Sequence, residues 1–285
     1  MLLSNLINPM LSKFNIVFFV TYFLYKTLVG FGETGHGVIV RVLDVGQGDS
    51  ILITTPNNKY VLIDGGPNYD SDRLLAKFMP PFSRCRLALV IVTHPHADHL
   101  YGLNKIIRRC SVDLVAYSDV AYKSTIFDSF KSLVKKIPYR QLVAGDKFGV
   151  GGVDFYVLWP AAAVLNNPPA NMNNISTVIF MDYKNFEGFF TGDAEYPVLS
   201  QLDTPYILPK IDGGLDLYKT AHHGSSNGLE RSLTTSLNPI NCVISAGKDN
   251  SFGHPHRLVL DFLAKINCKT IRTDQSGTYE LRTNY

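Results

Sequence analysis

The chain after residue 37 alternates short apolar runs with turn residues, and most of the runs have the length of a strand. Runs rich in β-branched and aromatic residues, bounded by glycine, asparagine or proline, predict β-strands. The predicted strands cover 38–45, 50–55, 60–66, 87–94, 113–117, 153–159, 177–183, 186–193, 216–221, 241–246, 269–273 and 277–283. Helical spacing of apolar residues predicts helices at 71–78, 99–109, 125–135, 229–237 and 255–266. Because both kinds of element are mixed and no fixed repeat occurs, we expect an α/β domain of sheets covered by helices.

An uncharged apolar run at residues 14–25 precedes this domain. Twelve residues are fewer than the roughly 20 that a spanning helix needs, and the run reaches that length only by including Lys26. It is compatible with an uncleaved anchor, a signal peptide or a helix packed on the fold. We therefore predict a hydrophobic anchor or signal segment at 1–32 and a folded domain at 33–285. That domain would be membrane-anchored and extracytoplasmic, or secreted.

Composition narrows the class of protein. With 46% apolar and 18% charged residues the chain is neither disordered nor fibrous, and a single candidate span excludes a multi-pass membrane protein. A net charge of +3 is too small to predict nucleic-acid binding by itself. The four cysteines form no CxxC pair, which argues against a thiolate zinc site. They are compatible with buried thiols or with one or two disulfides.

Seven of the eight histidines fall in three clusters, and each cluster follows a predicted strand. The most specific cluster is Thr93-His94-Pro95-His96-Ala97-Asp98-His99. Two histidines at i and i+2 can face one metal ion, and the Asp98-His99 pair can face a second ion beside it. Imidazole and carboxylate ligands suit zinc or manganese, and two such ions about 3.5–4 Å apart suit displacement at phosphorus. The spacing therefore predicts a site for two divalent metal ions.

The string THPHADH resembles the HxHxDH motif of the metallo-β-lactamase fold. Further strings in the expected order resemble the soluble domain of the ComEC family of DNA-uptake proteins, in a free-standing version. These strings are DVGQGDS (44–50), LIDGG (62–66), NNIS (173–176), TGD (191–193), KTAHHGS (219–225) and FGHP (252–255). The resemblance implies an αββα four-layer sandwich with the site at the rim between its two sheets.

The resemblance also implies a ligand set. His94 and His96 would hold the first ion, Asp98 and His99 the second, and Asp193 would bridge both. His222 would complete the second ion's shell and His223 would contact substrate, although these adjacent residues could exchange roles. Asp64 would orient a ligand histidine. Many hydrolases of this fold have another histidine before the bridging aspartate; here that position is open, with Asn174 or Ser176 as candidates to help fill it, which favours manganese.

The expected activity is metal-dependent cleavage of a phosphodiester, with single- or double-stranded DNA as substrate. Asp98 and Asp193 would act through the metals, and Lys219 and His223 would neutralise charge on the phosphoryl oxygens. Lys219 is equally compatible with a solvated strand position. His254, in a turn fixed by Gly253 and Pro255, would donate a proton to the leaving oxygen.

Other functions fit the same residues. The substrate could be a choline phosphodiester on a cell-surface polymer, or the chain could be a non-catalytic DNA-binding subunit of an uptake machine. A separate competence channel protein is an expected partner. Residues 101–150 carry nine lysines and arginines against four aspartates, a surplus of five, which fits either DNA contact or a solvated helix face.

Overall fold

The computed structural model describes residues 37–79, 85–202 and 204–283, which belong to one compact unit. The predicted segment 1–32 with its hydrophobic helix lies outside the described residues, so its boundaries stay a prediction. Among the helices of the described ranges, none has the length and apolar character needed to cross a bilayer.

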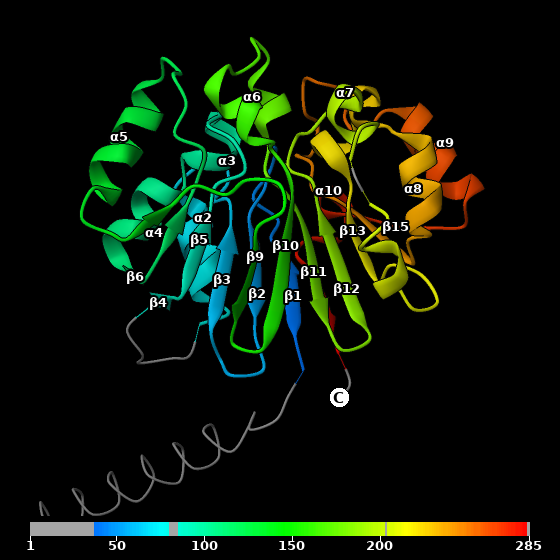
Figure 1. Cartoon of the computed structure of the whole chain (residues 1–285), viewed down its shortest axis with the longest axis horizontal. Helices are drawn as coiled ribbons and strands as arrows, with labels where there is room; N and C mark the ends of the chain where they lie inside the picture. The colour runs from blue at the N-terminus through cyan, green and yellow to red at the C-terminus, as the bar shows by residue number, and fades with distance from the viewer. Residues whose placement is uncertain (1–36, 80–84, 203, 284–285) are drawn as a thin grey trace, which may run out of the picture. The chain divides into compact units, whose positions relative to one another are not determined.

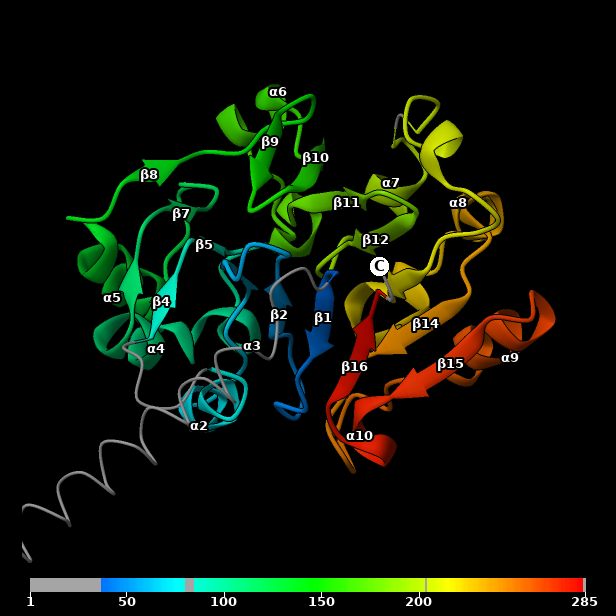
Figure 2. The same cartoon turned by 90° about the horizontal axis from the view of Figure 1, so that it is seen from below.

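Two seven-stranded sheets form the centre of this unit, and Figures 1 and 2 show them packed against each other. The first has the order β16-β1-β2-β3-β5-β7-β8 and the second β15-β14-β13-β12-β11-β10-β9. The first sheet's strands are β1 (Ile39–Val42), β2 (Ile51–Thr54), β3 (Tyr60–Ile63), β5 (Leu89–Ile91), β7 (Val115–Ala116), β8 (Tyr139–Arg140) and β16 (Tyr279–Arg282). The second sheet's strands are β9 (Lys147–Val150), β10 (Val153–Trp159), β11 (Val178–Tyr183), β12 (Phe186–Phe190), β13 (Leu217–Lys219), β14 (Asn241–Ile244) and β15 (Lys269–Arg272). A small sheet pairs β4 (Arg86–Leu87) with β6 (Ser111–Val112).

Strand residues alternate between two cores because successive side chains of a strand point to opposite faces. In β2, Ile51 and Ile53 face the second sheet, whereas Leu52 faces outward to the helices. The central core between the sheets also receives Val153, Phe155 and other residues of the second sheet. The central strands of each sheet are therefore buried on both faces, which explains why they read as almost continuous apolar runs.

Helices cover the outer face of each sheet (Figure 1). The first sheet is covered by α2 (Asp70–Ala76), α3 (Ala97–Leu100), α4 (Leu103–Arg109) and α5 (Thr125–Val134). The second is covered by α7 (Tyr196–Leu199), α8 (Arg231–Leu237) and α9 (Arg257–Lys265). The remaining α-helices are α6 (Ala162–Asn166) and α10 (Thr273–Ser276). The layer order helix, sheet, sheet, helix confirms the predicted αββα sandwich.

The predicted helix at 99–109 is interrupted in the structure. Helix α3 ends at Leu100 and α4 begins at Leu103, because the Gly102 N–H turns away to donate to the carbonyl of Gly66 at 2.9 Å. The interruption fixes the start of α3, where Asp98 and His99 lie, against the loop that follows β3.

The four cysteines form two disulfides, Cys85–Cys110 and Cys242–Cys268. The first ties the residue before β4 to the end of α4, and the second ties β14 to the start of β15. Of the two alternatives that the sequence left open, the disulfide alternative therefore applies to all four residues.

Removing either disulfide should lower the free energy of unfolding by about 3 kcal/mol, since each closes a loop of roughly 25 residues in the unfolded chain. We expect the variant Cys242→Ala with Cys268→Ala to unfold at a correspondingly lower urea concentration. Wild-type protein treated with a reductant loses both disulfides, so its stability should fall below that of this variant. Unchanged stability under reducing conditions would show that the cysteines are free thiols.

Candidate metal centre

The candidate ligands follow the carboxyl ends of parallel strands. Strands β3 and β5 pair in parallel in the first sheet, as do β12, β13 and β14 in the second. Asp64 follows β3, the THPHADH loop follows β5, Asp193 follows β12, and the His222-His223 pair follows β13. Since parallel strands end at the same edge of a sheet, these loops meet at one rim.

Asp64 holds the THPHADH loop in place. Its fully buried carboxylate accepts hydrogen bonds from the Thr93 N–H at 2.8 Å and the Thr93 hydroxyl at 2.7 Å. It also contacts His99 Nδ1 at 2.8 Å, and this leaves His99 Nε2 facing the site. Burial raises the pKa of Asp64, although the contact with His99 opposes the rise. Asp64 thus lies where the sequence placed it, behind a candidate ligand.

One oxygen of Asp193 faces two histidines. Asp193 Oδ1 lies 3.2 Å from His99 Nε2 and 3.4 Å from His223 Nε2. Asp98 Oδ2 lies 3.5 Å from the same His223 nitrogen. The four residues Asp98, His99, Asp193 and His223 each offer a ligand atom, and all these atoms lie within 4.8 Å of one another. This half of the site corresponds to the predicted second ion.

The other oxygen of Asp193 faces a second pair of rings. Asp193 Oδ2 lies 3.9 Å from His94 Nε2 and 3.8 Å from His222 Nε2. The His96 ring lies beside that of His94, with ring centres 4.7 Å apart. Asp193 therefore stands between two histidine groups, as a bridging carboxylate would.

The predicted roles of His222 and His223 are exchanged in the structure. His223 joins Asp98 and His99, whereas His222 lies on the side of His94, where the sequence left an open position. Both residues have left-handed backbones, with φ of 47° and 54°, which turns adjacent side chains to different sides. Gly224 follows at φ +80°, and a Cβ there would lie 2.6 Å from the Pro255 side chain.

His94, His99 and His223 are oriented as metal ligands usually are, with Nδ1 engaged by the protein and Nε2 turned into the site, whereas the Nε2 of His222 contacts the Asn173 amide at 3.4 Å. His94 Nδ1 contacts the Thr93 hydroxyl at 3.1 Å and His223 Nδ1 contacts the Ser245 carbonyl at 3.0 Å. His222 Nδ1 lies 3.4 Å from Glu195. Meanwhile the buried Nε2 atoms of His94, His99 and His223 and the buried Oδ1 of Asp193 have no hydrogen-bond partner. Buried polar atoms rarely stay unpaired, so this donor set fits divalent cations.

The negative charges of the carboxylates favour a cation at the Nε2 atoms of His99 and His223. Burial alone would lower the pKa values of His99 and His223. The neighbouring carboxylates, of which Asp193 has the largest effect, outweigh burial and hold both pKa values well above the usual range. Burial would raise the pKa of Asp193, yet His223 and His99 hold it well below its usual range. The carboxylates thus draw a proton or a metal ion to the rings, and metal binding would release the protons.

Lys219 does not contact substrate as the sequence suggested, nor is it solvated. Its side chain is fully buried, forms an ion pair with Asp49 at 2.9 Å, and donates to the Thr220 carbonyl. Asp49 also lies 3.5 Å from His223 Nδ1. Burial would raise the pKa of Asp49, but Lys219 and His223 lower it to about 2. The pair therefore supports the site from within the protein.

Asn174 and Ser176 support backbone near Asp193. Ser176 Oγ accepts a hydrogen bond from the Asp193 N–H at 3.1 Å, and Asn174 Oδ1 accepts one from the Glu195 N–H at 3.3 Å. The open position beside His94 is taken by His222, and Asn173 lies 3.4 Å from that ring. Asn174 and Ser176 thus bond to backbone N–H groups on this side of the site, and their predicted help at the open position stays a prediction.

His254 lies beside the candidate ligands, with its ring centre 5.6 Å from that of His222. Burial, together with His222 and His223, lowers the pKa of His254 to about 4. The ring is therefore neutral at pH 7. Gln47 donates to its Nδ1 at 3.4 Å, which favours the tautomer that carries the proton on Nε2.

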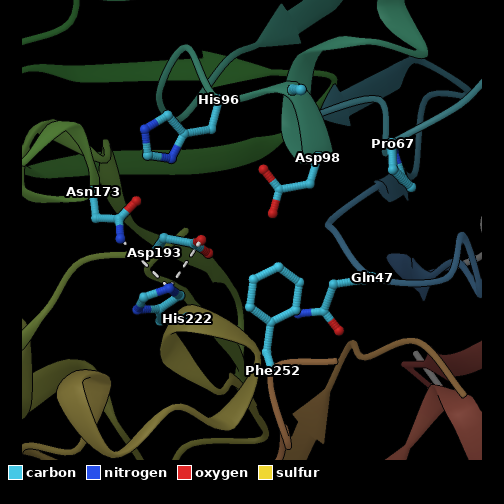
Figure 3. Close-up of a pocket in the computed structure, with 9 residues that line it drawn as sticks. Gln47, Pro67, His96, Asp98, Asn173, Asp193, His222 and Phe252 are labelled. Atoms are coloured by element: carbon cyan, nitrogen blue, oxygen red, sulfur yellow. Dashed lines mark hydrogen bonds and ion pairs between the residues drawn. The ribbon is translucent and has the colours of Figure 1, made fainter. Parts of the chain in front are cut away.

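A cavity of about 480 Å³ opens over this site. Figure 3 shows His96, Asp98, Asp193 and His222 facing it, with Phe252 on the opposite wall from His96. Several residues that hold or line the site had no role predicted from the sequence, and four of them are polar or charged: Gln47, Asp49, Asn173 and Glu195. All but Glu195 lie in the motif strings, whereas Glu195 follows Asp193 by two residues and had no spacing that could identify it.

Five of the nine lysines and arginines at 101–150 form ion pairs with aspartates, so part of the basic surplus is neutralised locally: Lys105, Arg109, Lys131, Arg140 and Lys147.

The described residues have the metallo-β-lactamase fold. Residues 43–162 match the Metallo-beta-lactamase superfamily. The YhfI protein of Bacillus subtilis, a metallo-β-lactamase fold protein, superposes with a TM-score of 0.54 at 12% identity, covering 85% of this chain and 99% of its own. At that identity the likeness shows the fold alone.

The relatives of this domain are of the ComEC family, as the motif strings predicted. ComE operon protein 3 of Bacillus subtilis (strain 168) is 27% identical over 278 residues, which are 91% of this chain and 34% of the relative. Recombination protein 2 of Haemophilus influenzae is 27% identical over 251 residues, 86% of this chain and 29% of the relative. The chain thus spans about a third of the length of these curated relatives.

The two adjacent histidines give a direct test of the site's geometry. We expect His223→Ala to remove one bound metal ion, because its nitrogen faces both Asp98 and Asp193. His222→Ala should weaken the ion beside His94 and leave the other bound. Elemental analysis and titration with Mn²⁺ would measure both. If His222→Ala removes the ion that depends on Asp98, the exchanged assignment is wrong.

Proposed function

We propose that this chain is a dinuclear metal-dependent phosphodiesterase that cleaves DNA outside the cytoplasm. The observation that carries the proposal is the arrangement around Asp193, whose two oxygens each face two histidine nitrogens. His94, His96, His222 and Asp193 would hold one divalent ion, and Asp98, His99, His223 and Asp193 the other. Zinc or manganese there would supply Lewis acidity toward a phosphoryl group and a nucleophile from water at neutral pH.

The chain's own residues would position the substrate. Asp98 is only partly buried and faces the cavity, so it can orient an attacking water by accepting its hydrogen bond. His254, being neutral, would donate a hydrogen bond from Nε2 toward the leaving oxygen rather than act as a charged acid. Because the His223 Nε2 atom faces Asp98 and Asp193, His223 would hold a metal ion rather than contact substrate.

Two further observations support DNA as substrate and a location outside the cytoplasm. One relative is named Competence protein ComA and another Recombination protein 2, which fits a role in DNA uptake. Disulfides persist mainly in oxidising compartments, and both cysteine pairs are bridged. The same proposal includes membrane attachment through residues 1–32. It also includes a separate competence channel protein as partner.

The test is cleavage by the purified full-length chain. With Mn²⁺ or Zn²⁺ we expect turnover of single- or double-stranded DNA, complete loss with EDTA, and recovery on return of metal. Glycerophosphocholine serves as the competing ester. DNA binding without turnover at saturating metal would instead identify a non-catalytic subunit, and cleavage of the choline ester alone would identify the other phosphodiesterase.

A further inference from the structure

Phe252 is an exposed aromatic residue at the mouth of the metal centre. Its side chain is 64% exposed, the largest fraction among the large apolar side chains of the described residues. It is also one of the residues that line the 480 Å³ cavity, and Figure 3 shows its ring projecting into that space opposite Asp98. An apolar ring exposed inside a functional cavity is a candidate contact for ligand.

The loop that carries Phe252 is tightly held. Asn250 Oδ1 accepts hydrogen bonds from the N–H groups of Phe252 at 3.2 Å and His254 at 3.0 Å. The Asn250 amide donates in turn to the carbonyls of Gly247 at 2.9 Å and His254 at 2.6 Å. The Phe252 ring stacks on the His254 ring, with centres 5.8 Å apart and planes 25° apart. The ring therefore has one face on the protein and its position is fixed before any ligand arrives.

The cavity offers little else to hold the organic part of a substrate. None of the nine described residues that line it is lysine or arginine, so a phosphate would depend on cations at the Asp193 site. The amide nitrogens of Gln47 and Asn173 on its walls are already engaged, and the Asn173 Oδ1 atom is buried. Gln47 contacts His254 and accepts the Gly247 N–H, and Asn173 donates to Glu195. These contacts leave stacking on Phe252 as the main interaction for a flat group.

We propose that Phe252 is a stacking platform for an unpaired nucleobase next to the phosphodiester in the metal centre. This inference rests on the proposed function and names its substrate class: single-stranded nucleic acid with little sequence preference. A base in a duplex already stacks on its neighbours, so its faces are not available to the ring. Because every base has an aromatic face, stacking accepts all four bases.

The test compares the full-length wild type with Phe252→Ala, Phe252→Trp and the matched control Leu258→Ala. Leu258 lies on α9, is 50% exposed and does not line the cavity. The probes are a thymidine oligonucleotide, the same strand with abasic residues, and its duplex form, each measured for binding and for Mn²⁺-dependent cleavage. We expect Phe252→Ala to raise Kd and KM for the thymidine strand about 5- to 100-fold, with kcat nearly unchanged. Phe252→Trp and Leu258→Ala should retain wild-type values.

The abasic strand separates stacking from a general effect on the loop. Wild type and Phe252→Ala should handle it equally, and the wild type should bind it as weakly as the variant binds the thymidine strand. If the wild type cleaves normal and abasic strands with the same KM, the stacking inference is overturned and the nuclease proposal stands. If the wild type binds the normal strand more tightly than the abasic strand but cleaves neither, the stacking inference stands and the nuclease proposal is overturned. Absence of both binding and cleavage overturns both.

Discussion

Replacing Asp193 by alanine is expected to weaken metal binding more than about 100-fold and to abolish phosphodiesterase activity, by at least about 10³-fold. Loss of a residue that only supports a ligand already costs about 10- to 100-fold in metal affinity. Asp193 contacts both histidine groups through different oxygens, so its loss affects both candidate ions. A single donated interaction in the transition state is itself worth about 10²- to 10³-fold in rate. Calorimetric titration with Mn²⁺ and a cleavage assay would measure the two losses.

The fold should survive this change. In the metal-free protein Asp193 is paired with His99 and His223, which hold its pKa well below the usual range, so its loss should lower the metal-free Tm. Circular dichroism of Asp193→Ala should still match that of the wild type, because the two cores between and outside the sheets are untouched. Asp98→Ala is the informative control, because Asp98 lies in only one half of the site and its replacement should remove only one of the two bound ions. An Asp193→Ala protein that keeps two tightly bound ions would contradict the bridging role.

The general position of this site could be predicted because its residues lie in short strings after apolar strands. THPHADH, TGD and KTAHHGS each follow a strand that belongs to a parallel pair, and strand order alone brings such ends together. The layers were predictable for a related reason: strands buried on both faces read as apolar runs without alternation.

What the sequence could not settle depends on backbone angles and burial. His222 and His223 are adjacent and chemically identical, and only their left-handed conformations decide which one faces Asp98. The sequence does not distinguish a solvated Lys219 from one that is buried in an ion pair, because its partner Asp49 is 170 positions away along the chain. The disulfide pairing likewise depends on distances between strand and helix ends that spacing does not contain.

The second large effect is expected from Lys219→Met, which should lower the free energy of unfolding by about 3–5 kcal/mol. The change leaves the Asp49 carboxylate buried without its opposite charge, and an uncompensated buried charge is among the most destabilising defects. Lys147→Met is the matched control. Lys147 also forms an ion pair at 2.9 Å, with Asp154, but both side chains are about half exposed, so its replacement should change the free energy of unfolding far less than Lys219→Met does. Urea denaturation of the metal-free proteins would compare them.

The double variant Lys219→Met with Asp49→Asn separates stability from function. It removes both charges at nearly constant volume, and buried pairs replaced in this way often cost little, so most of the lost stability should return. Metal affinity should not return, because the asparagine is a weaker partner for His223 Nδ1 than the carboxylate 3.5 Å away. We expect one ion to bind about 10- to 100-fold more weakly in this stable protein. Full recovery of metal affinity together with stability would show that Asp49 and Lys219 serve folding alone.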